Sequence, residues 1–235
     1  ACYPEMVQIV VSKASGIKSV PDMRGKRICV GAVGSGYEVA ARQILGIYGM
    51  TYDDIDERFL SQSEAKNALQ DDQIDAFFMC SGYPNANVTE LSLTGKIDVI
   101  SIDDGHIWLL LEKYPFYAEY ATPDDQYKLG HPVNSVAVMS MLVALKELGE
   151  DDVYAITEAI YENLGELRGV NRKAEHMSLE NPFRGIPGNI HPGAARFYKE
   201  KGIENILALR GDLPQDGTRS EDYRYAVQLI RDIKE

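Results

Sequence analysis

The sequence predicts an α/β fold with a largely parallel sheet. Short apolar runs that fit buried β-strands alternate along the chain with segments whose apolar residues recur at helical spacing. Two of these strands lead directly into a glycine-bearing turn, and a helix follows each turn. This alternation is typical of βα units that assemble into one sheet covered by helices.

The first elements follow from the apolar pattern. We expect a strand over residues 6–11 and a second strand over residues 26–30. A helix with one apolar face is predicted over residues 39–48, and Gly49 ends it as a C-terminal cap. Residues 51–75 contain eight acidic and two basic residues, a net charge of −6, and we interpret this stretch as a solvated helix face.

The later elements are predicted in the same way. Further strands are expected over residues 74–80, 97–102, 134–143 and 206–209. Further helices are expected from about Ala86, over 106–111 with a stop at Tyr114-Pro115, over 153–167, from His191-Pro192 and over 223–233.

The charge and hydropathy of the chain exclude several kinds of partner. The 235 residues include 24 Lys and Arg and 36 Asp and Glu, so the net charge is 24 − 36 = −12. This charge argues against nucleic acid and against an anionic membrane surface as partners, because both require basic residues. No run of eighteen apolar residues is present, so we expect no membrane insertion, and the opening residues show no signal-peptide pattern.

The cysteines and histidines do not form a recognisable metal or catalytic motif. Cys2, Cys29 and Cys80 lack metal-ligand spacing, and we expect Cys29 and Cys80 to be small buried apolar residues. The four histidines form no HExxH pair and are interpreted as surface or helix-cap residues. No GxSxG element is present either, so we predict no catalytic residue, no metal and no cofactor, and a binding protein rather than an enzyme.

The first candidate ligand site is the turn that contains Gly34, Ser35, Gly36 and Tyr37. It follows a strand and opens a helix, where free backbone N–H groups and the positive end of the helix dipole favour an anion. The turn lacks the Lys-Ser/Thr pair of a P-loop and the spacing of a dinucleotide fingerprint. The same pattern also fits a tight turn without a ligand, and the sequence leaves both readings open.

The second candidate is the turn Gly82, Tyr83, Pro84 and Asn85, which again lies between a strand and a helix. In open α/β sheets, ligands collect at the carboxyl ends of the strands, so two such turns on neighbouring strands would form one wall of a cleft. Ordinary turn chemistry of Gly, Pro and Asn explains the second turn equally well.

From about Ala1 to Gly202 the chain resembles the TAXI-type solute receptors of TRAP transporters. The opening Tyr3-Pro4-Glu5 with VQIVV begins this resemblance. The longer segments that carry it, in order, are SGIKSVPDMRGKRICVGAVGSGYEVAARQIL, DAFFMCSGYPNANVTEL, DDVYAITEAIYENLGEL and IPGNIHPGAARFYKEKGI.

The resemblance implies a type II periplasmic-binding-protein fold, in which two α/β lobes close on a small ligand. It implies an extracytoplasmic receptor that delivers a carboxylate such as glutamate or 2-oxoglutarate to the membrane subunits of a TRAP transporter. It also implies that both candidate turns face the cleft from the second lobe. Tyr37 stands where the family has a Thr-like residue, and Tyr83 stands where it has His before the proline.

The resemblance further implies a domain layout. Residues 1–15 would be the strand that crosses from the first lobe, 16–130 the second lobe, and 131–202 the return segment with helices that pack on the first lobe. Because the chain opens within a predicted strand, we expect most of the first lobe to lie upstream. On this layout residues 203–235 are a foreign strand–helix tail.

That tail resembles methylenetetrahydrofolate reductase, a flavin-dependent barrel enzyme. The resemblance rests on ALRGDLP, whose Asp212 would lie by the flavin and folate, and on DYRYAVQLIRDIKE. One strand and one helix cannot form a barrel. We therefore expect a truncated receptor joined to a reductase piece by gene fusion or by a sequence-assembly error, and the alternatives are a reductase fragment and an inactive fragment.

Overall fold

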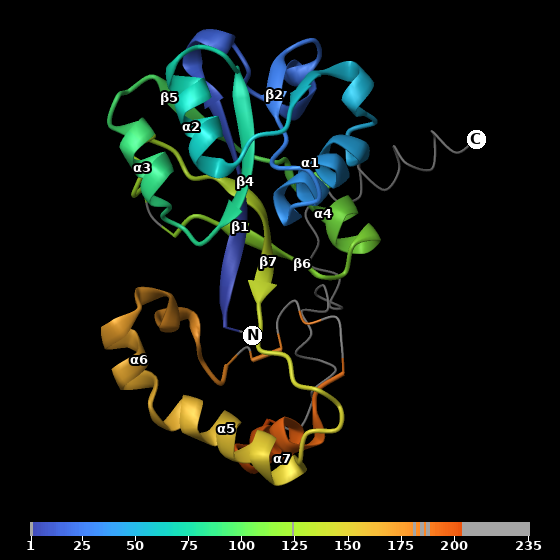
Figure 1. Cartoon of the computed structure of the whole chain (residues 1–235), viewed down its shortest axis with the longest axis vertical. Helices are drawn as coiled ribbons and strands as arrows, with labels where there is room; N and C mark the ends of the chain where they lie inside the picture. Colours follow the sequence, from blue (N-terminus) through green and yellow to red (C-terminus); the bar gives the residue numbers. More distant parts are fainter. Residues whose placement is uncertain (1, 124, 181, 184–185, 187–188, 204–235) are drawn as a thin grey trace, which may run out of the picture. The chain divides into compact units, whose positions relative to one another are not determined.

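The computed structural model describes residues 2–203 except 124, 181, 184, 185, 187 and 188 (Figure 1). These residues divide into two compact units, one of residues 5–138 and the other of residues 2–4 with 139–203. The predicted strand over 206–209 and the predicted helix over 223–233 lie outside the described residues.

A seven-stranded sheet is the central element, with the order β3-β2-β4-β1-β7-β6 and with β5 paired to β1. Its strands are β1 (Tyr3–Ser12), β2 (Arg27–Cys29), β3 (Asp56–Arg58), β4 (Ala76–Ser81), β5 (Ile97–Ile100), β6 (Tyr117–Ala121) and β7 (Asn134–Ser140). Together with the helices on both faces of this sheet, the order confirms the predicted α/β fold class.

Strands β2, β3, β4 and β5 run in the same direction. β2 pairs in parallel with β3 and with β4, while β4 and β5 both pair antiparallel with β1. The parallel part of the predicted sheet is therefore β2 to β5, and β1 runs against it. β6 and β7 form an antiparallel pair.

The helices are α1 (Gly36–Ile47), α2 (Gln62–Gln70), α3 (Ala86–Ser92), α4 (Asp104–Lys113), α5 (Glu150–Glu162), α6 (Leu164–Val170) and α7 (Pro192–Glu200). Side-chain caps fix several of their first turns, since Ser35, Ser61, Asn85 and Asp103 each accept a backbone N–H at the start of a helix. The predicted helix start at His191-Pro192 is confirmed, with His191 as the cap of α7.

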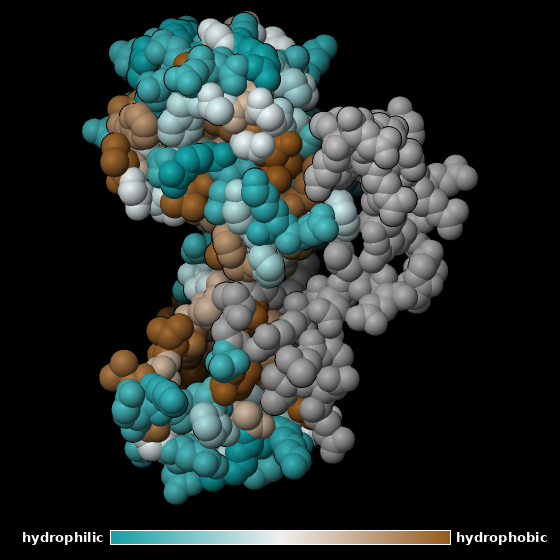
Figure 2. All heavy atoms as spheres, turned by 90° about the vertical axis from the view of Figure 1, so that its right-hand side faces the viewer, coloured by the Kyte–Doolittle hydropathy of each residue, from teal (hydrophilic) through white to brown (hydrophobic). Residues whose placement is uncertain are grey.

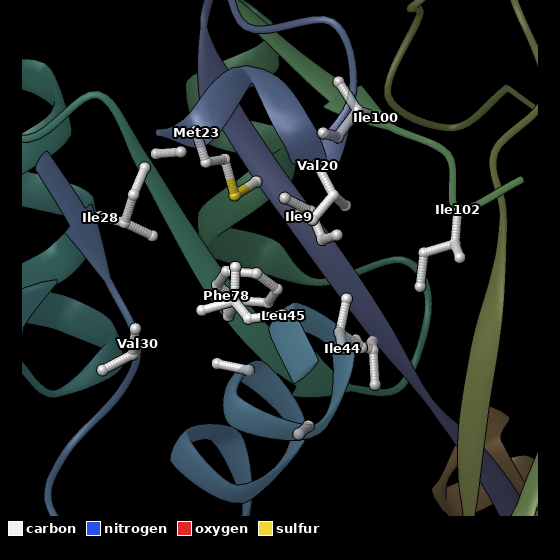
Figure 3. Close-up of a cluster of buried hydrophobic side chains, with 14 of the residues drawn as sticks. Ile9, Val20, Met23, Ile28, Val30, Ile44, Leu45, Phe78, Ile100 and Ile102 are labelled. Carbon is white, nitrogen blue, oxygen red and sulfur yellow. The ribbon is translucent and has the colours of Figure 1, made fainter. Parts of the chain in front are cut away.

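The sheet separates two apolar cores in the unit of residues 5–138. On one face, alternate residues of β1, including Ile9, pack with α1 and α4, and Figure 3 shows Ile44 and Leu45 of α1 converging with Ile9 and Phe78. On the other face, Met6 and Val10 of β1 pack with α2 and α3. Since successive side chains of a strand point to opposite faces, one buried strand contributes to both cores.

The structure corrects three predicted segments. β7 ends at Ser140, so the strand does not extend to residue 143. The helix predicted over 153–167 is two helices, α5 and α6, which meet at Asn163. The Asn163 Nδ2 donates to the carbonyl oxygen of Ala159 at 2.7 Å, a side-chain bond to the preceding turn that competes with the helical ladder. Residues 51–75 are not one helix, because the short strand β3 precedes α2.

Both cysteines that were predicted to be buried apolar residues are buried. Cys29 lies in β2 and Cys80 lies in β4, with exposed fractions of 1% and 7%. Burial raises the pKa of each thiol, so both stay protonated at neutral pH. This environment confirms a packing role for the two side chains.

Candidate functional site

The two predicted turns lie at the same edge of the sheet. The first turn, residues 31–36, follows β2, and the second turn, residues 82–85, follows β4. β2 and β4 are adjacent and parallel, with Cys29 paired to Phe77, so both strands end at the same side. The topology therefore places the two turns on neighbouring strands, at the edge where ligands of open α/β sheets collect.

Glycine is required where the first turn begins. Gly31 has a φ of 101°, a conformation that side-chain-bearing residues rarely adopt. A Cβ at Gly31 would lie 2.8 Å from the Cβ of Tyr37, so the turn also closes tightly on the start of α1. Ser35 then caps the helix, with its Oγ accepting the N–H of Glu38 at 3.2 Å.

The N-terminus of α1 presents unused donors. Within the described residues, the backbone N–H groups of Gly36 and Tyr37 have no hydrogen-bond partner. Glu38 is in the same first turn, but its Oε1 accepts the hydroxyl of Tyr52 at 2.7 Å and lies 3.6 Å from Arg42. Two free donors at the positive end of a twelve-residue helix are suited to a carboxylate.

Tyr37 is half-buried and packs against the core on the α1 face of the sheet. Burial raises the pKa of its phenol, and the nearby Cys80 and Glu5 raise it further. Its hydroxyl is therefore protonated at neutral pH and can donate a hydrogen bond.

The second turn is organised differently from the first. Gly82 is buried, Pro84 is exposed and follows a cis peptide bond, and Asn85 caps α3. The Asn85 Oδ1 accepts the N–H groups of Asn87 at 2.9 Å and Val88 at 3.4 Å. The cap of α3 thus occupies the N–H groups of its second and third residues, and α3 spans seven residues against twelve in α1, so we regard α1 as the better anion site of the two.

A buried polar network behind the second turn was missed by the sequence analysis. The hydroxyl of Tyr127 accepts the N–H of Asn85 at 2.7 Å and donates to Oε1 of Gln8 at 2.6 Å. Gln8 is fully buried in β1, and its Nε2 donates to the carbonyl oxygen and Oγ of Ser81 at 3.3 and 3.2 Å. A glutamine within an apolar strand was the available signal, since a buried polar side chain requires partners.

A second polar cluster lies where α4 begins. Asp103 accepts the hydroxyl of Tyr48 at 2.7 Å and contacts Nδ1 of His106 at 2.8 Å, and the Tyr48 and His106 rings stack 3.6 Å apart. His106 and Tyr48 hold the pKa of Asp103 below its usual range, although burial opposes this shift. The Asp103 carboxylate, although its side chain is 60% exposed, thus binds Tyr48 and His106 and joins the start of α4 to the end of α1.

The residues that the structure describes contain neither a metal-ligand group nor a helix that could span a membrane. Among them, no three His, Cys, Asp or Glu side chains are grouped so that they could hold a metal ion. Among the same residues, no helix combines the length and the hydropathy needed to cross a bilayer.

Comparison with known proteins identifies the family. The model of the NMT1-like family matches residues 1–202, and the chain belongs to this family. The model of methylenetetrahydrofolate reductase matches residues 189–235, so residues 189–202 fall within both matches, and the second begins earlier than the predicted boundary at residue 203.

Solved structures of transport proteins are similar to this chain at low identity. The aliphatic sulphonate binding protein SsuA from Escherichia coli is 16% identical over 98% of this chain and 55% of its own, with a TM-score of 0.37. SsuA from Xanthomonas axonopodis pv. citri, bound to MOPS, is 18% identical over 99% of this chain and 67% of its own, with a TM-score of 0.37. A histidine-bound ABC transporter substrate binding protein from Streptococcus pneumoniae is 14% identical over 72% of this chain and 58% of its own, with a TM-score of 0.41. The chain thus spans just over half the length of the first of these proteins.

Proposed function

We propose that this chain is part of an extracytoplasmic solute receptor that binds a small carboxylate of the glutamate or 2-oxoglutarate class. The receptor would deliver this ligand to the membrane subunits of a TRAP transporter. Membership of the NMT1-like family supports a solute-binding role, and the resemblance to TAXI-type receptors suggests the carboxylate and the transporter class. The proposed ligand-facing residues are Gly34, Ser35, Gly36, Tyr37, Gly82, Tyr83, Pro84 and Asn85.

One observation carries the proposal. Two turns lie at the carboxyl ends of adjacent parallel strands, and α1 begins at one of them with the N–H groups of Gly36 and Tyr37 unpartnered among the described residues. A carboxylate would accept these two N–H groups and would be stabilised by the helix dipole, and hydrogen bonds to a charged group contribute about 1.5–3 kcal/mol.

The domain layout is part of the same proposal. Residues 1–15 would cross from a first lobe, residues 16–130 would form the second lobe, and residues 131–202 would return and pack on the first lobe. Residues 203–235 would be foreign to the receptor. A ligand between two lobes needs both of them, so the binding test should include the chain preceded by the first lobe.

A pair of substitutions at Gly36 tests the proposed carboxylate contact. Gly36→Pro removes one N–H at the first position of α1, where proline fits the helix and where Ser35 already has the extended backbone that precedes proline. Gly36→Ala keeps the N–H, and its Cβ would meet nothing within 4 Å. We expect calorimetry to show about tenfold weaker binding of L-glutamate or 2-oxoglutarate for the proline variant only.

The unchanged protein provides the first control. A ligand at a hundredfold excess over Kd should raise the stability of the folded protein by about 2.7 kcal/mol, which is measurable as a thermal shift. No shift with either carboxylate, in the protein with both lobes, would contradict the proposed ligand class. Equal affinity in both Gly36 variants would contradict the proposed contact.

The reductase match supplies a second candidate function, a flavin-dependent folate reductase fragment. It rests on residues 189–235 alone. The described strands form a sheet whose order runs from β3 to β6, which differs from the closed eight-stranded barrel of that chemistry. Purified chain that takes up added FAD and oxidises NADH would support this candidate, and colourless protein that does neither would dismiss it.

A further inference from the structure

Two tyrosines join the second turn to residues 125–130 in opposite directions. Tyr127 accepts the N–H of Asn85 at 2.7 Å, and Tyr83 accepts the N–H of Gln126 at 2.9 Å. Their rings meet edge to face, with centroids 4.9 Å apart and planes inclined at 70°. Each segment thus supplies a tyrosine hydroxyl that accepts a backbone N–H of the other segment.

The two phenols differ in their surroundings. Tyr127 is 1% exposed, and its hydroxyl connects Asn85 to the fully buried side chain of Gln8 in β1. Burial raises the pKa of Tyr127 far above its usual value, so this hydroxyl donates to Gln8 at neutral pH. The donor of Asn85 and the acceptor of Gln8 therefore both depend on one oxygen atom.

Residues 125–130 are themselves fixed by local hydrogen bonds. The carboxylate of Asp125 accepts the N–H groups of Leu129 at 2.6 Å and Gly130 at 2.8 Å. These bonds hold the pKa of Asp125 below its usual range, so the carboxylate is charged and continues to accept at neutral pH. The segment that presents Tyr127 is a closed turn, which gives the phenol a fixed position.

We infer that Tyr127 is a positioning residue that holds the second turn and the cap of α3 in place against β1. It lies forty-two residues beyond the turn in sequence and is buried, so it would act through Asn85 rather than by contact with a ligand. Its effect on binding rests on the proposed function, whereas its effect on the turn does not.

Tyr127→Phe and Tyr117→Phe form a matched pair for testing this role. Tyr117 in β6 is 3% exposed and donates one hydrogen bond to Oε1 of Gln43 at 2.7 Å, on the α1 face of the sheet. Each variant removes one buried hydroxyl, but only the first removes the acceptor of the Asn85 N–H. If Tyr127 contributed only to the stability of the whole fold, both variants would change amide exchange at the second turn equally.

Residue-resolved amide exchange on the ligand-free protein is the primary measurement. Tyr127→Phe should speed exchange of the Asn85 N–H by about tenfold or more relative to Tyr117→Phe, because one hydrogen bond of ordinary strength is lost at that site. Equal Asn85 exchange in the two variants would overturn the inference. If Tyr127→Phe does not fold, exchange in the unchanged protein decides: the Asn85 N–H should exchange more slowly than the N–H of Gly36, and equal exchange of the two would overturn the inference.

Calorimetry with L-glutamate and with 2-oxoglutarate gives the second readout. Tyr127→Phe should weaken binding about tenfold while Tyr117→Phe leaves it unchanged. If the unchanged protein binds neither compound, the proposed function fails and the exchange result still decides the positioning role. If Asn85 exchange responds but affinity does not, Tyr127 positions a turn that the ligand does not use, and the binding part of the inference is wrong.

Discussion

The two compact units differ in how much apolar surface each one buries by itself. In residues 5–138, apolar side chains on both faces of the sheet form two large cores. In residues 2–4 and 139–203, the described core contains Phe183, Phe197 and Tyr198, with partly buried neighbours around them. A sheet covered by helices on both faces is self-sufficient, whereas three helices around three rings bury much less.

The smaller unit also exposes more apolar surface. Leu142, Val143 and Leu145 have exposed fractions of 70%, 85% and 78%, and Val170 reaches 87%. Brown apolar residues are visible at the surface in Figure 2 among the teal polar ones. The fold of residues 5–138 is therefore stabilised by its own sheet and helices, whereas the described part of the smaller unit is stabilised mainly by contacts among a few aromatic rings.

The largest expected effect is from Phe197→Ala. Phe197 is fully buried and its ring contacts Tyr154, Tyr161 and Tyr198. The substitution should cost about 3–5 kcal/mol, which is most of what so small a core can provide. Amide exchange should therefore show loss of protection throughout α5 and α7.

Phe78→Ala is the comparison in the larger unit. Phe78 is 2% exposed and belongs to the core on the α1 face (Figure 3), so the cost is also about 3–5 kcal/mol. Here the many remaining core residues should keep α1 and β4 protected under native conditions. Retained protection of α5 in Phe197→Ala would show that the smaller unit is not as weakly held as its core suggests.

Gly193→Ala should have the next largest effect, again in the smaller unit. A Cβ at Gly193 in α7 would lie 2.1 Å from the carbonyl oxygen of Glu150 and 2.8 Å from the N atom of Tyr154, both backbone atoms of α5. Forcing the helices apart should cost about 1–3 kcal/mol in the free energy of unfolding. Gly165→Ala in α6 meets nothing within 4 Å and should be neutral or stabilise by up to about 1 kcal/mol. Equal thermal stability of the two variants would refute close α5–α7 packing.

A smaller, pH-dependent effect is expected for Asp75 in the larger unit. Asp75 accepts the Arg27 backbone N–H at 2.8 Å and guanidinium Nη2 at 2.7 Å, and the guanidinium holds the pKa of Asp75 below its usual range. A lowered carboxylate pKa gives stability that is present above about pH 4 and lost as pH falls through the folded value. Asp75→Asn should thus lose about 1 kcal/mol at pH 7 and show a flatter decline between pH 5 and 2 in urea titrations. An unchanged slope would contradict the ion pair.

The smallest effect is expected at His131. Its Nδ1 lies 2.9 Å from the carbonyl oxygen of Pro132 and its Nε2 lies 2.8 Å from Oδ1 of Asp98, and these acceptors raise its pKa despite partial burial. A raised histidine pKa gives stability that is present below about pH 6.5 and lost as pH rises through the folded value. Because the pair is exposed, His131→Gln should cost at most about 0.5 kcal/mol at pH 6 and nothing at pH 9. A larger loss at pH 9 than at pH 6 would reverse this assignment.

The sequence predicted the layers better than their contacts. Apolar periodicity located β1, β2, β4 and α1, because hydrophobic spacing directly reflects which face is buried. The helix-start pattern at His191-Pro192 located α7. It missed β3, which has no apolar residue, and β6, a five-residue run that contains two alanines and a glutamate, residues that are depleted in strands. It also could not pair Tyr127 with Asn85, because a hydrogen bond between residues forty-two apart depends on the folded topology.

The predictions agree with the structure better in residues 5–138 than in the smaller unit. In residues 5–138 each predicted strand is buried in the sheet, so pattern and structure agree. In the smaller unit Ile156 and Leu167 fit an apolar helical face, yet they are 51% and 38% exposed. The two turns were correctly placed on neighbouring strands, and their contact with a ligand stays a prediction.

An NMR titration of the two-lobed protein with L-glutamate, followed through the backbone amides, tests the proposed carboxylate contact. Saturable shifts are expected at the N–H groups of Gly36 and Tyr37, where the donors are unpartnered among the described residues, with smaller shifts at Gly82. The N–H of His106, which Asp103 already accepts at the start of α4, should stay unchanged. Saturable binding that leaves Gly36 and Tyr37 unshifted would contradict this contact.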